Sequence, residues 1–223
     1  MRNAQQAALP LSFEPSFTVE DFVVSACNEE AYRRVTAWPG WPSFCLNVHG
    51  GRGSGKTHLA RIWKEKTQAL ELEAGNLPAL LSQPWTEGQR AYLLELGDNV
   101  RDEKALLHLY NRCKENGDWL LLTSAKPLPQ INVALPDLSS RLNALPSVGL
   151  GEPDDLALEA VLRKLFTDRQ LKVSEEVARF LLARMERSFD AAHRLVERLD
   201  SLSLEHQRRI SIPLVNQALG AVW

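Results

Sequence analysis

The ten residues at positions 49–58, HGGRGSGKTH, constrain the fold of this chain more than any other segment. From Gly50 to Thr57 they match G-x-x-x-x-G-K-[ST], a pattern typical of loops that hold phosphate groups. Glycines reach positive φ at little cost, so that consecutive N–H groups can turn toward phosphate oxygens. Lys56 supplies a cation for the β and γ phosphates, and the hydroxyl of Thr57 supplies a ligand for Mg²⁺. The segment therefore predicts a nucleotide site.

The residues on both sides of this loop favour the strand–loop–helix arrangement that such a site requires. Positions 43–48, SFCLNV, predict a short buried strand, and positions 57–66, THLARIWKEK, predict a helix with one apolar face. A glycine-rich turn beside an unrelated lysine is the alternative, and the flanking pattern argues against it. The residues expected to contact the nucleotide are Gly50, Gly51, Gly53, Ser54, Gly55, Lys56 and Thr57.

Further along the chain, near-continuous apolar runs alternate with helical patterns. Positions 90–96 and 119–124 predict buried strands, with a helix at 102–115 between them. Such an alternation indicates an α/β fold with a parallel sheet that is covered by helices on both faces. Ligands of these sheets bind beyond the carboxyl ends of the strands, where Glu95 and Thr123 also fall. The other elements expected here are a helix at 28–37 that is capped by Asn28, a strand at 70–73, and a loop through Gly75 and Pro78.

Beyond residue 153 the pattern becomes purely helical. Four amphipathic segments follow one another with short breaks, at 155–170, 174–186, 189–201 and 212–219. We therefore expect a flexible tail at 1–16, a nucleotide-binding domain at 17–152, and a small all-helical domain at 153–223.

Composition excludes several classes of protein. The chain has 223 residues and a formal net charge of −2, so that no overall positive field favours direct binding of nucleic acid. No apolar run approaches the roughly 20 residues needed to span a membrane. The three cysteines, Cys27, Cys45 and Cys113, lack metal-ligand spacing and are typical of reduced thiols in a cytoplasmic protein.

Four segments together resemble the AAA+ ATPases, and among them the replication initiator DnaA and the shorter Hda-type regulators. These are FTVEDFVV at 17–24 with Asn28 and Ala31, GGRGSGKTH at 50–58, LLTSAKP at 121–127 and LPDLSSRL at 135–142. The resemblance implies an AAA+ P-loop domain followed by a helical lid. It implies an adenine pocket that includes Phe22, Val23 and Val24, and a nucleotide contact for His58. The last segment is similar to the Hda-type arginine-finger motif, and no helix-turn-helix segment follows the lid pattern.

The resemblance also implies two functional elements outside the nucleotide site. Arg141 would act as an arginine finger in trans, on the ATP of a neighbouring DnaA molecule. The alternative is a surface arginine that pairs with Asp137 at i,i+4. Positions 6–11, QAALPL, resemble the peptide by which these regulators bind the DNA sliding clamp, with contacts from Gln6, Leu9, Pro10 and Leu11. The alternative here is a tail whose leucines pack on its own domain.

Three departures from the family pattern concern ATP hydrolysis in the chain's own site. Glu95 is the expected Mg²⁺-side acid beside Thr57, and Thr123 is expected near the γ phosphate or the attacking water. However, Leu96 stands where the family places a second acid, and Ala125 where the initiator has one. Asp190 stands where the lid would supply an arginine. We therefore expect nucleotide binding with weak or no intrinsic hydrolysis.

Three functions remain open from the sequence. The favoured hypothesis is a regulator that holds ADP or ATP with Mg²⁺, binds the clamp and stimulates hydrolysis by DnaA; it would meet DNA only indirectly, and self-association into a homo-oligomer is open. An autonomous AAA+ ATPase, acting as initiator or loader, would instead turn over ATP alone and lose that turnover on Lys56→Ala. A nucleic-acid-binding module would show salt-sensitive DNA binding.

Overall fold

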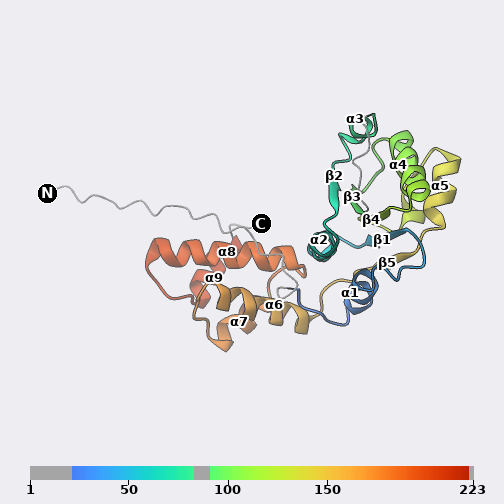
Figure 1. The fold of residues 1–223 in the computed structure, drawn as a ribbon. Helices are drawn as coiled ribbons and strands as arrows, with labels where there is room; N and C mark the ends of the chain where they lie inside the picture. The colour runs from blue at the N-terminus through green and yellow to red at the C-terminus, as the bar shows by residue number, and fades with distance from the viewer. Residues whose placement is uncertain (1–21, 83–90, 221–223) are drawn as a thin grey trace.

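The computed structural model describes residues 22–82 and 91–220, which form a five-stranded sheet with helices on both faces and a separate helical group (Figure 1). The strand order is β2-β3-β4-β1-β5, and every neighbouring pair is parallel. This confirms the expected covered parallel sheet. The strands are β1 Cys45–His49, β2 Leu70–Leu72, β3 Ala91–Gly97, β4 Trp119–Ser124 and β5 Ser147–Gly149.

The strand register brings the expected site residues to one edge of the sheet. His49 at the end of β1 lies beside Ser124 at the end of β4, and Glu95 of β3 lies beside Thr123. The loop after β1 therefore leaves the sheet at the same edge as the last residues of β3, which include Glu95. This is the carboxyl edge at which parallel sheets bind ligands.

Side chains of β3 and β4 alternate between two apolar layers. Tyr92, Leu94 and Leu96 pack in the layer under the helices α3 Leu77–Leu81, α4 Glu103–Asn116 and α5 Pro136–Asn143. Ala91 and Leu93 pack in the other, under α1 Glu29–Thr36 and α2 Lys56–Thr67. Because successive side chains of a strand point to opposite faces, position 95 belongs to the face of α2 and position 96 to the face of α4.

Three local features differ from the sequence expectations. The expected loop through Pro78 is wrong for residues 77–81, which form the short helix α3; a proline in the first helical turn removes no helical hydrogen bond. Strand β5 was not expected, because three residues are too few to show a period. Asn28 does precede α1, but its side chain accepts from the Ser25 N–H and donates to the Val23 carbonyl, both at 2.9 Å, instead of capping the helix.

The helical group contains the four helices that the sequence predicts. They are α6 Asp155–Asp168, α7 Glu175–Leu182, α8 Phe189–His206 and α9 Ile212–Gly220, and they enclose one apolar cluster. The side chains of Asp154, Ser174 and Ser188 accept hydrogen bonds from first-turn N–H groups of α6, α7 and α8. These caps explain why each helix begins where it does. Helix α8 continues five residues beyond the expected end and stops at Gln207, whose φ is +51°.

The two parts of the molecule meet near α2 (Figure 1). Helices α6–α9 gather on one side of this junction, whereas α5 lies at the opposite end of the molecule. Within the part of the chain that the structure describes, no helix combines the length and apolar character needed to cross a membrane.

Candidate nucleotide-binding cleft

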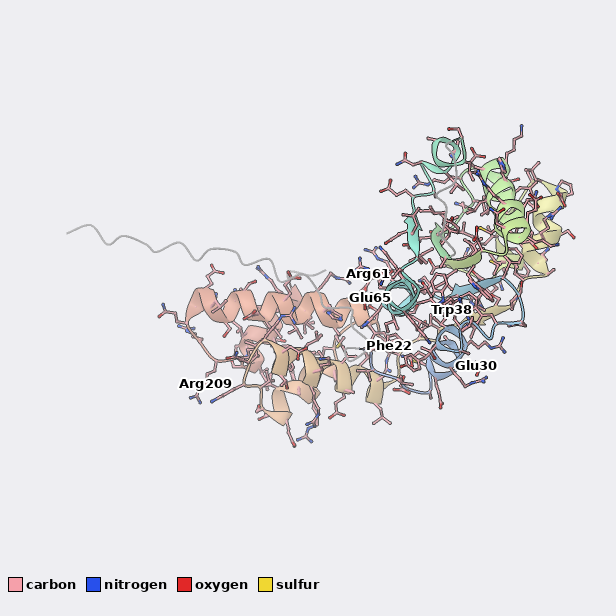
Figure 2. All side chains as sticks on the ribbon, in the orientation of Figure 1. Phe22, Glu30, Trp38, Arg61, Glu65 and Arg209 are labelled. Atoms are coloured by element: carbon pink, nitrogen blue, oxygen red, sulfur yellow. The ribbon has the colours of Figure 1, made fainter. Side chains whose placement is uncertain are left out.

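A cleft of about 540 Å³ opens between the sheet and the helical group. This volume falls within the range of small-molecule sites, roughly 300–1,000 Å³. The cleft is lined by the segment before α1, the loop with the start of α2, Glu95 of β3, and residues of α6 and α8. Figure 2 shows Phe22 at the junction of the two parts, where this cleft lies.

The loop at 50–57 has the backbone that the glycine pattern predicts. Gly53 and Gly55 have φ of +72° and +95°, a region that disfavours any side chain. Lys56 begins α2, and its Nζ donates to the carbonyl oxygens of Gly50 and Gly51, each at 2.8 Å. Gly55 gives α2 no side-chain cap, so that the first-turn N–H groups of the helix have no side-chain partner from that position. Such a helix start favours an anionic ligand.

Lys56 lines the cleft at the start of α2. Burial lowers the pKa of its amine, and the negative charges of Glu95, Asp190 and Asp98 act in the opposite direction. Glu95 and Asp190 line the same cleft. Leu96, by contrast, is only 7% exposed and packs in the core on the α4 side of the sheet. Strand β3 therefore presents one carboxylate to the cleft at its end.

The other end of the cleft is aromatic and apolar. The ring of Phe22 stacks on Tyr32 at a centroid distance of 5.5 Å and meets the ring of His58 edge-on at 5.1 Å. Phe22, Val23 and His58 line the cleft together with Asn28, and Val23 also packs against the helical cluster. Val24 is 46% exposed and does not line the cleft.

The cleft walls gather several of the expected nucleotide contacts. Those lining it are Phe22, Val23, Gly53, Gly55, Lys56, Thr57, His58 and Glu95. Gly50, Gly51 and Ser54 belong to the same loop but are not among the lining residues. Thr123 is buried between β3 and β1 and does not line the cleft either. The hydroxyl of its neighbour Ser124 donates to the Lys126 carbonyl at 2.7 Å.

Arg141 lies on α5 and is not part of the cleft. Its guanidinium donates twice to the carboxylate of Asp137, at 2.8 and 3.2 Å, and lies 5.5 Å from the ring centroid of Tyr110. The hydrogen bonds to Asp137 raise the pKa of Arg141, so that it stays cationic. The i,i+4 pair considered from the sequence is thus present, and it holds the guanidinium at the surface of the molecule. The expected clamp-binding residues, Gln6, Leu9, Pro10 and Leu11, lie outside the described residues.

On the lid side of the cleft, sequence reasoning singled out Asp190 through the family resemblance and missed most of the other lining residues. These residues share one face of α6 or of α8: Val161, Lys164, Leu165 and Asp168, and Asp190, His193, Arg194 and Glu197. Both sets repeat at three- and four-residue intervals, a spacing that predicts a common face but not what that face meets. Burial lowers the pKa of His193. The charges of Arg169 and His58 act in the same direction, and those of Asp190 and Glu197 act in the opposite direction.

The described residues contain no cluster of three His, Cys, Asp or Glu side chains that could hold a metal ion by itself. The hydroxyl of Thr57 and the carboxylate of Glu95 both line the cleft. Oxygen donors of this kind suit Mg²⁺, which usually takes one or two protein ligands together with phosphate oxygens. The donor set therefore fits magnesium that arrives with a nucleotide.

Comparison with known proteins gives three kinds of match. A family model described as the lid domain of Hda matches residues 155–219, the four helices of the lid. An uncharacterized protein of Haemophilus influenzae is 33% identical over 185 residues, which are 78% of this chain and 80% of that protein.

Solved structures match nearly the whole chain at low identity. Domain III of the Thermotoga maritima replication initiation protein DnaA has a TM-score of 0.80 and 18% identity over 93% of this chain and 97% of that one. The AMPPCP-bound DnaA of Aquifex aeolicus has a TM-score of 0.63 and 16% identity over 92% and 81% of the two chains. These likenesses establish the AAA+ fold of the sheet domain and the lid.

Proposed function

The chain belongs to the Hda-type, DnaA-related family of AAA+ replication regulators, and we propose that it binds a nucleotide and stimulates ATP hydrolysis by DnaA. In this proposal Arg141 acts in trans, on ATP that is held by the partner. The observation that carries it is the separation of two features. The phosphate loop faces the lid cleft, whereas Arg141 lies on α5, at the end of the molecule far from the lid (Figure 1).

The cleft would hold ADP or ATP. Lys56 would meet the phosphates, and Phe22, Val23 and His58 would surround the base. Thr57 and Glu95 would hold Mg²⁺, which neutralises phosphate charge when bound. A nucleotide that touches both the loop and the lid would stabilise their docked arrangement, so that the site would act as a conformational latch.

The chain's own catalytic set is incomplete. Hydrolysis needs a residue that orients the attacking water in addition to a magnesium ligand. Leu96 follows Glu95 but lies in the core on the opposite face of β3, and Thr123 is buried away from the cleft. These placements support weak or no turnover by the protein alone. They argue against an autonomous initiator or loader, which would hydrolyse ATP without DnaA.

An arginine in trans stabilises negative charge that develops on the transferring phosphoryl group. In analogous GTPases this effect is worth about 10³–10⁵ in rate. The guanidinium of Arg141 would have to exchange Asp137 for phosphate oxygens at the partner's site. The pair is partly solvated, with side-chain exposures of 31% and 59%, and partly solvated ion pairs are weak enough for such an exchange.

The decisive assay measures hydrolysis of ATP bound to DnaA in the presence of DNA-loaded sliding clamp. The variant Arg141→Ala is compared with Arg163→Ala, whose guanidinium makes an equivalent i,i+4 pair with Glu159 at 2.8 Å. We expect Arg141→Ala to abolish stimulation and Arg163→Ala to retain it. Equal stimulation by Arg141→Ala and the unaltered protein would refute the role of Arg141 as an arginine finger.

Clamp binding is proposed through residues 6–11, which resemble the family's clamp peptide. A glutamine at the rim of a pocket and leucines in an apolar groove are a plausible peptide anchor, and Pro10 reduces the entropy lost on ordering. Co-sedimentation with the clamp on DNA tests this directly. Replacing both Leu9 and Leu11 by alanine should remove binding, and unchanged binding by that variant would contradict the proposal.

A further inference from the structure

The start of α8 packs directly on the phosphate loop. The N–H of Phe189 donates to the carbonyl of Gly53 at 2.9 Å. A Cβ placed on Gly53 would lie 2.8 Å from Cβ of Ser188 and 3.2 Å from Cβ of Asp190. The lid therefore touches the loop through the start of α8, and Asp190 is one of the residues at that contact.

Asp190 brings a negative charge to the phosphate end of the cleft. It lines this cleft together with Lys56 and Glu95, and its charge acts on Lys56 in the same direction as that of Glu95. Three arginines, Arg52, Arg169 and Arg194, also line the cleft. Arg52 is exposed, and Arg194 lies 3.7 Å from the carboxylate of Glu186, outside the cleft lining.

We propose that Asp190 is a specificity-determining residue that favours a nucleoside diphosphate over a triphosphate while the lid is docked on the loop. The inference rests on the proposed nucleotide binding. A triphosphate extends farther along the loop and carries more negative charge than a diphosphate. It would therefore meet the carboxylate of Asp190, or force α8 away from Gly53 and break the contact between the Phe189 N–H and the loop.

Repulsion of this kind acts through a partly screened cleft, where neighbouring unit charges still interact appreciably. We expect it to weaken triphosphate binding relative to diphosphate by at least about tenfold, or about 1.4 kcal/mol. The diphosphate should be affected much less, because its terminal phosphate stops short of the lid contact.

The test measures Kd for ADP and for the ATP analogue AMPPCP by calorimetry, at one fixed Mg²⁺ concentration. Asp190→Asn removes the charge and keeps the size of the side chain. Asp190→Glu keeps the charge, and Asp200→Asn removes a charge from α8 outside the cleft lining. We expect Asp190→Asn to tighten AMPPCP binding at least about tenfold while ADP changes less than about threefold. Both control variants should keep the original ratio of the two Kd values.

The outcomes separate this inference from the function on which it rests. If ADP binds normally and Asp190→Asn shifts both Kd values equally, or neither, the role of Asp190 is refuted and nucleotide binding stands. If Asp200→Asn changes the ratio as much as Asp190→Asn, the effect is a general one of charge, and the inference is again refuted. If neither nucleotide binds to any of the proteins, nucleotide binding and the inference fail together.

Discussion

Replacing Gly53 by alanine should separate the lid from the phosphate loop. The φ of Gly53 is +72°, and a residue with a Cβ is strained there by about 1–2 kcal/mol. The new methyl group would also lie 2.8 Å from Cβ and 3.0 Å from Oγ of Ser188, closer than nonbonded atoms approach. Backbone strain and steric overlap therefore act at the same residue.

Ser188 cannot move away without cost. Its hydroxyl caps α8 by accepting from the Ala191 N–H at 3.1 Å, and the adjacent Phe189 N–H donates to Gly53. Overpacking of a closed contact costs typically 1–3 kcal/mol. Together with the backbone strain, we expect a loss of at least about 2 kcal/mol, which lowers Tm by at least about 4 °C in a protein of this size.

The measurement is thermal unfolding followed by circular dichroism, without nucleotide. Gly51→Ala is the matched control, because a Cβ there would have no heavy atom within 4 Å. Hydrogen exchange adds a local readout, since the Phe189 amide should lose protection only when the lid leaves the loop. The reasoning fails if Gly53→Ala unfolds within about 1 °C of Gly51→Ala and protects the Phe189 amide equally well.

Three further outcomes follow from the site and the lid. Saturating ADP should stabilise the protein by about 2.7 kcal/mol at 100 times Kd, measured as a rise in Tm. Lys56→Ala should lose this rise, whereas Lys114→Ala, at an exposed position, should keep it. Equal rises in the two variants would contradict the role of Lys56 in nucleotide binding. Because burial depresses the pKa of His193 below the ordinary histidine value of about 6.5, the unfolded chain binds the proton first as pH falls. Stability should therefore decline below about pH 6.5, and His193→Gln should reduce that decline in unfolding scans between pH 7 and 5 more than His206→Gln does. Asp154→Ala removes the cap that accepts from the first turn of α6 and should cost about 1 kcal/mol, or about 2–4 °C in Tm, and an unchanged Tm would show that the cap is not needed.

The fold was largely predictable because most of its elements carry their own local pattern. Strand β4 has the expected limits, and the caps of α4, α6, α7 and α8 fall at or next to the expected helix starts. The short elements were not predictable. Strand β5 has three residues and helix α3 has five, which are too few to show a periodic pattern of apolar residues. Their structure is set by packing against neighbours that lie far away in the sequence.

The residues of the cleft were likewise predictable only in part. Its loop is a contiguous motif, so that the sequence alone named Lys56 and Thr57. Its lid wall is made by faces of α6 and α8, whose partner across the cleft depends on how the lid docks. The family resemblance pointed to Asp190 as the lid position that faces the nucleotide, whereas spacing alone could not place His193 in the cleft. The contact between Gly53 and the start of α8 shows that Asp190 lies at the phosphate loop.

The separation of Lys56 from Arg141 makes the two halves of the proposed function separable by experiment. Lys56 lines the cleft under the lid. Arg141 lies on α5 with Asp137 and close to Tyr110 of α4, and none of these three residues lines the cleft. Substitutions at distant sites without shared partners act independently. Arg141→Ala should therefore leave the nucleotide affinity of the isolated protein unchanged while it removes stimulation of DnaA. If it weakened nucleotide binding in the isolated protein, the finger would belong to the chain's own site, and action in trans would have to be abandoned.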